Sequence, residues 1–144
     1  MQTREILRIK GGVIYSVSPD ATLASALATM VEKDIGSLVA MEHGRLVGML
    51  TFREVLGAAN ANKGSVSDMK VRDVMVADPE TVGTDMEVDD LRRVMIDTHA
   101  RYVPVKDGNT LVGVLSFHDV AKAMLEEQAF ENRMLKGYIK NSLE

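Results

Sequence analysis

The chain carries no cysteine and no tryptophan. Without cysteine it can form no disulfide framework, no thiol nucleophile and no cysteine-ligated zinc or iron–sulfur site. Only three phenylalanines and three tyrosines are present, so aromatic platforms for single-stranded nucleic acid are scarce. Positive charge is also short, because 17 Lys and Arg face 21 Asp and Glu, for a net charge of -4. Nucleic-acid binding needs a surface that neutralises phosphates, so we expect no nucleic-acid partner.

Long apolar runs are missing as well. No run approaches the roughly 20 residues that span a bilayer, and charges recur through residues 1–10, unlike in a signal peptide. We therefore expect a cytoplasmic protein with no membrane partner. The 144 residues are 46% hydrophobic and 26% charged, which is typical of a globular chain. A chain of this length buries roughly 70% of its unfolded surface, so it needs no metal to fold.

An internal repeat is the most informative feature of the sequence. A shift of 65 positions aligns residues 17–55 with residues 82–120 without a gap. Average composition would give roughly two or three identities by chance. Nine pairs are identical: Val17/Val82, Asp20/Asp85, Met30/Met95, Leu46/Leu111, Val47/Val112, Gly48/Gly113, Leu50/Leu115, Phe52/Phe117 and Val55/Val120. The repeat predicts a duplicated small α/β unit, whose two copies pack face to face about a pseudo-two-fold axis to gain core.

Both copies are predicted to follow the same order of elements: strand, helix, strand, strand, helix. The first copy is expected to have strands at 15–17, 37–41 and 45–50, and helices at 21–33 and from Thr51. The second copy is expected to have strands at 81–82, 102–106 and 110–115, and helices at 87–98 and from Ser116. The fold class is therefore α/β (α+β).

The linker between the copies is expected in residues 60–68, which are rich in Asn, Gly and Ser. For residues 69–75 the sequence leaves open a connecting strand or a short helix. The predicted domain boundaries are 8–66 for the first repeat, 67–130 for the second and 131–144 for a C-terminal helical extension.

The extension carries an apolar stripe. Phe130, Met134 and Tyr138 are four residues apart and share one helical face, which Leu135 and Ile139 widen. A bare stripe of this kind would be an unusual exposed patch, so we expect a homodimer that buries it. The alternative is a helix that folds back on its own repeats or frays beyond Gly137.

Signatures of catalysis are absent from the sequence. It contains no HExxH, no phosphate-binding glycine loop, no GxGxxG and no Ser–His–Asp spacing. The histidines are His43, His99 and His118, and no dense carboxylate cluster accompanies them, so we expect no metal site. A binding module is therefore favoured over an enzyme that acts on a nucleotide.

Several short motifs in combination resemble the CBS-domain pair, also called the Bateman module. The marks are residues 48–51 and 113–116 at the hairpin ends, the acids Glu54 and Asp119 three residues on, residues 78–82 at the second entry and residues 101–105 on the middle strand. The resemblance covers about residues 8–130, so we expect no separate catalytic domain. It implies a stand-alone, non-catalytic regulatory protein that binds an adenine nucleotide (AMP, ADP, ATP or NAD), forms a homodimer and signals to an unidentified effector protein.

The resemblance places the ligand residues mainly in the second copy. It implies that Ser116 and Arg101 contact phosphate and that Asp119 contacts the ribose diol. A carboxylate can accept from both ribose hydroxyls, and a helix N-terminus and a guanidinium both suit phosphate. The predicted nucleotide-binding set is Thr81, Arg101, Tyr102, Val103, Pro104, Ser116, His118 and Asp119.

The first copy departs from this pattern. Gly36 stands where the second copy has Arg101, and Glu54 is one methylene longer than Asp119. Arg53 could supply a phosphate contact. We expect a second site here to be weaker, and it would comprise Ser16, Gly36, Ser37, Leu38, Thr51, Arg53 and Glu54.

Two interpretations of the hairpin-end motifs stay open at this point. Ser116-x-x-Asp119 and Thr51-x-x-Glu54 both match a capping box, in which the hydroxyl caps the helix and the acid reaches back to it. The leading functional hypothesis is an adenine-nucleotide sensor for signal transduction. The alternative is a structural or protein-interaction module with degenerate pockets, and titration with nucleotides separates the two.

Overall fold

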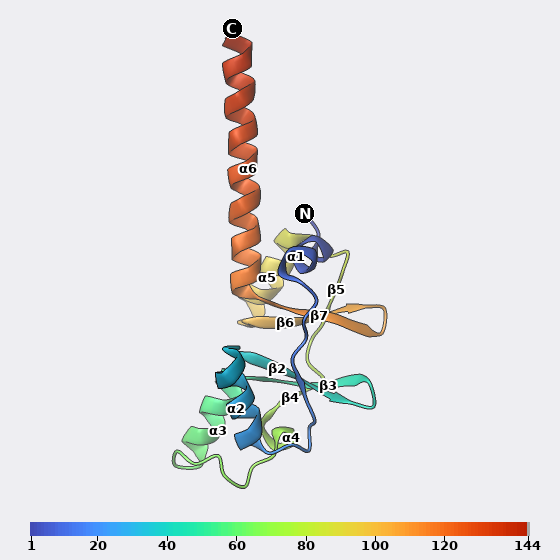
Figure 1. The fold of residues 1–144 in the computed structure, drawn as a ribbon, viewed down its shortest axis with the longest axis vertical. Helices are drawn as coiled ribbons and strands as arrows, with labels where there is room; N and C mark the ends of the chain where they lie inside the picture. Colours follow the sequence, from blue (N-terminus) through green and yellow to red (C-terminus); the bar gives the residue numbers. More distant parts are fainter. Residues whose placement is uncertain (144) are drawn as a thin grey trace.

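The computed structural model describes residues 1–143, and the side chains of residues 1–139. Figure 1 shows two stacked α/β units, from which the last helix projects. In chain order the elements are α1 (Thr3–Lys10), β1 (Ser16–Val17), α2 (Leu23–Lys33), β2 (Ser37–Glu42), β3 (Arg45–Thr51), α3 (Phe52–Ala61), α4 (Val71–Val74), β4 (Val76–Ala77), β5 (Val82–Gly83), α5 (Val88–Thr98), β6 (Tyr102–Asp107), β7 (Thr110–Ser116) and α6 (Phe117–Leu143). Glu144, which ends the predicted extension, lies outside the described residues.

The two sheets repeat the same pairing. The first has the order β1-β2-β3-β4 and the second the order β5-β6-β7. In each, the short first strand runs parallel to the middle strand, and a hairpin follows. The hairpins even shift register at the same repeat position, between Ala40 and Met41 and between Val105 and Lys106. The predicted fold class, a pair of strand–helix–strand–strand–helix repeats, is confirmed.

Helical periodicity explains how α2 and α5 cover these sheets. Leu23, Ala26 and Met30 are the buried residues of α2, three and four positions apart. Thr22 begins that helix, because its side chain accepts a hydrogen bond from the backbone of Ser25 at 3.1 Å. The buried residues of α5 are Val88, Leu91 and Met95, at the equivalent repeat positions. Each helix therefore contributes one apolar face to the core of its own unit.

The two cores do not follow the order of the chain. Ile6 of α1, only 2% exposed, belongs to the core beneath the second sheet. Val71 of α4, fully buried, belongs to the core of the first unit. We call the β1–β4 sheet with α2, α3 and α4 the first unit, and the β5–β7 sheet with α1, α5 and the start of α6 the second unit. The chain thus begins in the second unit, crosses to the first and returns.

The segments 1–7 and 69–75 occupy equivalent places in the two units. Their backbone hydrogen bonds form matching pairs: Val88 N to Met1 O and Leu23 N to Met69 O, Thr3 N to Met86 O and Val71 N to Ala21 O, Arg4 N to Thr84 O and Arg72 N to Pro19 O. Leu7 then lies against Gly113, as Met75 lies against Gly48, and a side chain at either glycine would overlap its partner. The pseudo-two-fold relation therefore extends beyond the aligned repeat.

This arrangement bears on the linker and the boundaries. The segment 69–75, for which strand and helix were both open, contains the short helix α4, and β4 follows and pairs with β3. The boundaries 8–66, 67–130 and 131–144 stay a prediction about the chain. The packing itself crosses them, since residues before 8 complete the second unit and residues after 66 complete the first.

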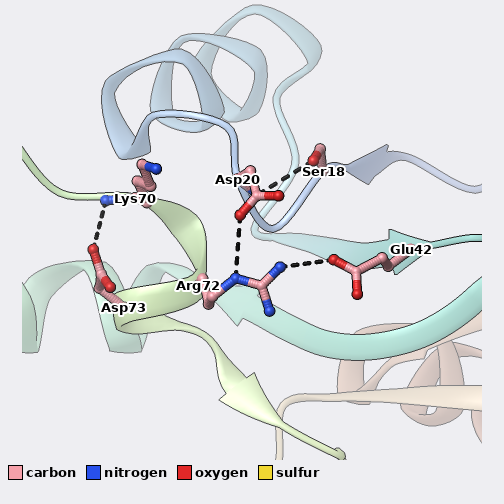
Figure 2. Close-up of polar contacts among 6 residues, drawn as sticks. All are labelled: Ser18, Asp20, Glu42, Lys70, Arg72 and Asp73. Atoms are coloured by element: carbon pink, nitrogen blue, oxygen red, sulfur yellow. Dashed lines mark hydrogen bonds and ion pairs between the residues drawn. The ribbon is translucent and has the colours of Figure 1, made fainter.

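Arg72 attaches α4 to the surface of the first unit, as Figure 2 shows. Its Nε donates to Asp20 Oδ1 at 3.2 Å, and its Nη2 donates to Glu42 Oε2 at 2.7 Å. Asp73 accepts from the backbone of Lys70 at 3.0 Å and so closes the first turn of α4. The ion-paired side chains keep between 36% and 64% of their surface exposed, so the buried Val71 contributes more to stability than the ion pairs.

Helix α6 is much longer than its counterpart α3. It continues to Leu143 and extends away from both sheets (Figure 1). The predicted stripe is exposed on it: Phe130 56%, Met134 62%, Leu135 59% and Tyr138 73%. The helix does not fold back on the repeats, and it continues past Gly137. No helix in the described part of the chain is long and apolar enough to cross a membrane.

Candidate functional site

The turn between β7 and α6 holds the central pair of predicted ligand residues. Ser116 N donates to Asp119 Oδ2 at 2.8 Å, and Asp119 N donates to Ser116 Oγ at 3.0 Å. These reciprocal bonds form a capping box, so the hydrogen bonds expected from the capping interpretation are present at this turn. It does not use the whole carboxylate, because none of the hydrogen bonds found among the described residues reaches Asp119 Oδ1. That oxygen can still accept from a ligand hydroxyl.

A lysine from the other end of the chain also binds Asp119. Lys10 Nζ lies 2.7 Å from Asp119 Oδ2 and donates to the Val114 carbonyl, also at 2.7 Å. Burial raises the pKa of the Asp119 carboxyl, but the hydrogen bonds from Lys10 and Ser116 and the charge of Lys10 outweigh burial. The pKa of Asp119 therefore lies below its ordinary value, and the group is an anion at neutral pH.

The equivalent turn of the first unit is closed more tightly. Thr51 N donates to Glu54 Oε1 at 2.9 Å, and Thr51 Oγ1 lies 3.0 Å from each Glu54 carboxylate oxygen. Both oxygens of Glu54 are thus engaged within their own turn, and none of the ion pairs found in the described residues brings a cation to them. The longer acid consequently serves the cap more completely than Asp119 does.

A cleft of about 1140 Å³ lies between the two units. The first unit contributes the start of α3, and the second contributes the end of α5 and residues 101–104. Across the cleft, Phe52 and Tyr102 meet edge to face, with ring centroids 6.2 Å apart. The guanidinium carbon of Arg101 lies 5.7 Å from the centroid of the Phe52 ring, a cation–π distance. The cleft therefore offers aromatic edges beside a cation.

Tyr102 also closes the first unit near Gly36. Its hydroxyl fills the space beside Gly36, where any side chain would overlap it. Burial raises the pKa of the Tyr102 hydroxyl, so the group stays protonated at neutral pH. The position that corresponds to Arg101 in the first repeat is therefore covered by the second unit.

The structure divides the predicted residues into groups. The cleft brings Arg101, Tyr102, Val103 and Pro104 together with three residues of the second predicted set, Thr51, Arg53 and Glu54. Ser116 and Asp119 do not line it, although β6 and β7 place Tyr102 opposite Ser116 and the backbone of Phe117 donates to Arg101 O at 2.8 Å. The second-repeat turn and the cleft thus adjoin one end of the same sheet.

The remaining predicted residues lie outside the cleft. His118 is exposed on α6, in a shallow groove with Ala121 and Leu125, and Thr81 is half-buried just before β5. Ser16 is exposed on β1, and Leu38 of β2 is only 1% exposed in the first core. Gly36 and Ser37 are half-buried at the start of β2. Among the side chains of residues 1–139 no three acidic or histidine groups gather as metal ligands.

Phe52 and Lys10 are among the residues of this region that are missing from the predicted sets. Phe52 faces the cleft, and its identity with Phe117 in the repeat, directly after Thr51, was the available signal. Lys10 has no such signal, because 109 positions separate it from Asp119.

A scan against family models matches the CBS domain model twice, at residues 11–61 and 71–126. The chain belongs to the CBS domain family. An uncharacterized 17.7 kDa protein of Acidianus ambivalens is 34% identical over 115 residues, which are 78% of this chain and 68% of that protein.

Solved structures of CBS proteins share the fold of this chain. A putative signal-transduction protein with CBS domains from Burkholderia ambifaria superposes with a TM-score of 0.83 and 26% identity, covering 89% of this chain and 96% of that one. The crystal structure of CBSX2 in complex with AMP superposes with a TM-score of 0.67 and 25% identity. The superposition covers 78% of this chain and 89% of that one. The resemblance to the CBS-domain pair is confirmed.

Proposed function

We propose that this CBS pair is a non-catalytic regulatory sensor that binds an adenine nucleotide at the second-repeat turn. The observation that carries the proposal is the ionised Asp119, which keeps Oδ1 available beside the N-terminus of α6. Oδ1 accepts one ribose hydroxyl directly, and Oδ2 accepts the other when Lys10 leaves it. At the N-terminus of α6 the N–H groups of Ser116, Phe117 and Asp119 already donate within the chain, so the His118 N–H and the positive end of the helix are what suit a phosphate. The related structure of CBSX2 with AMP supports the choice of ligand class.

The chemistry around the turn fits a ligand with an aromatic base. Arg101, Tyr102 and Pro104 lie at the same end of the second sheet and open into the cleft between the units. A base inserted there would contact both units at once. Its binding would change how the units meet, and that change is the signal we propose an effector protein receives.

Titration of the purified chain with AMP, ADP, ATP and NAD by isothermal calorimetry tests this function. We expect one tight ligand per chain, because both oxygens of Glu54 are engaged in the first-repeat turn. If none of the four compounds binds, the sensor proposal fails. Two equal tight sites per chain would contradict the asymmetry between the repeats.

A structural or protein-interaction module is the second candidate, and one observation favours it. Both hairpin-end motifs already form capping boxes within the chain, and Lys10 also binds Asp119 Oδ2. Such a module would hold its two units in one arrangement without a ligand. The same calorimetric titration then shows no heat of binding for any nucleotide.

We also propose a homodimer built on α6. Phe130, Met134, Leu135 and Tyr138 project from a helix that leaves the body of the chain, and none of them is less than 56% exposed. A two-fold arrangement lets the same stripe serve both copies. Burial of large apolar side chains provides the free energy for such an association.

A further inference from the structure

Lys10 is placed at Asp119 by the packing of α1. Ile6 of that helix is buried in the second core, and the Thr3 hydroxyl donates to the Met86 carbonyl at 2.8 Å. The helix is therefore anchored through residues 3–7, and Lys10 ends it less than one turn later. Only the flexible four-carbon side chain needs to move for the ammonium group to change partners.

The first unit has no counterpart of this lysine. There, β4 covers the outer edge of the hairpin, and Met49 pairs with Val76. In the second unit the equivalent residue is Val114, and its carbonyl accepts from Lys10 Nζ instead. The ammonium thus takes the place of a strand at this edge and reaches Asp119 from it.

We propose that Lys10 is a specificity-determining residue that makes the second-repeat site prefer phosphorylated ligands to neutral nucleosides. The inference rests on the proposed nucleotide function. A ribose diol that takes both oxygens of Asp119 displaces Lys10 from Oδ2. A phosphate gives the released ammonium a new anionic partner, whereas a neutral nucleoside gives it none.

The donor count of the lysine supports this exchange. An ammonium group has three N–H donors, and Asp119 and Val114 use two of them. The third donor can meet a phosphate oxygen before the bond to Asp119 breaks. The change from one anion to another then keeps a charge-assisted hydrogen bond throughout, and such bonds are the stronger ones.

The experiment compares AMP with adenosine on the intact chain and on three variants. Lys10→Met removes the ammonium and keeps the apolar stem, and Lys10→Arg keeps the charge. Arg8→Met removes an exposed cation from the same helix and is the matched control. Calorimetry gives both dissociation constants for each chain, and circular dichroism verifies the fold.

We expect the preference for AMP over adenosine to fall about tenfold in Lys10→Met, the scale of one hydrogen bond to a charged group. It should be retained in Lys10→Arg and in Arg8→Met. An unchanged preference in a folded Lys10→Met, with the wild type binding both compounds, overturns the role of Lys10 and leaves the sensor function standing. If Lys10→Met binds AMP and adenosine more tightly than the wild type by the same factor, the role of Lys10 is also overturned. In that case Lys10 would only compete with the ribose for Asp119. If the wild type binds neither compound, the sensor function and this inference fall together.

Discussion

Replacing Ile6 by alanine tests whether the start of the chain completes the second unit. Ile6 is 2% exposed in the core formed with Val82, Leu91 and Leu115. Loss of a buried isoleucine side chain to alanine removes its transfer free energy and leaves a cavity. We expect the free energy of unfolding to fall by about 3 kcal/mol, within the 2–5 kcal/mol found for such changes.

The matched control is Ile9→Ala on the same helix. Ile9 is 63% exposed, so this change should alter the free energy of unfolding by less than about 0.5 kcal/mol. Urea denaturation followed by circular dichroism gives both values. Amide hydrogen exchange then locates the effect, and protection should fall first in β6 and β7. Equal destabilisation by the two variants, or protection lost first in β2 and β3, would refute the crossed arrangement.

The other predictions concern three separate features. The folded-state pKa of Asp119 lies below its ordinary value of 3.8, so its ion pair stabilises the fold above that pH and is lost as pH falls through the folded value. The difference in stability between the wild type and Asp119→Asn should therefore become smaller as the pH falls. Urea midpoints measure this difference, and a difference that does not change with pH would contradict the prediction. Gly36→Ala should destabilise the chain by about 1–3 kcal/mol through overlap with Tyr102, and Tyr102→Phe should recover part of the loss; full stability of the single variant would refute the overlap. Truncation after Gln128 should weaken the dimer in sedimentation and leave the repeats folded, whereas an intact chain that is monomeric at micromolar concentration would contradict the dimer.

Local patterns in the sequence predicted most of the fold. Alternation and helical spacing are short-range signals, so strands such as β6 and helices such as α2 emerge from residues that are near one another. The repeat supports each predicted element twice, since aligned residues such as Leu50 and Leu115 are expected at equivalent places in the two copies. The bounds differ from the predictions by one or two residues at most of these elements.

The sequence does not reveal that the chain crosses between the units, because the first residues repeat at a different shift from the rest. Residues 17–55 match at a shift of 65, whereas Arg4 corresponds to Arg72 and Leu7 to Met75, a shift of 68. Three residues of difference between the connecting segments break the alignment. The matching segment is also too short to stand out from chance.

The candidate site shows a different limit of sequence reasoning. The acid three residues after Ser116 was compatible with a cap and with a ligand contact, and the structure shows that the cap uses one oxygen only. A carboxylate has several acceptor positions, so the two roles do not exclude each other. The position of Lys10 depends on the crossed packing of α1, and no local spacing encodes it.

Calorimetric titration of AMP into Asp119→Ala and Glu54→Ala tests the central claim most directly. The two variants remove equivalent acids from the two repeats, so each controls for loss of a capping box. We expect Asp119→Ala to weaken AMP binding at least about thirtyfold, or about 2 kcal/mol, because the ribose hydroxyls lose a charged acceptor. Glu54 also lines the cleft, but its oxygens are held within its own turn, so Glu54→Ala should weaken AMP binding much less than Asp119→Ala does. A folded Asp119→Ala variant with unchanged affinity for AMP would show that Asp119 serves only as a cap.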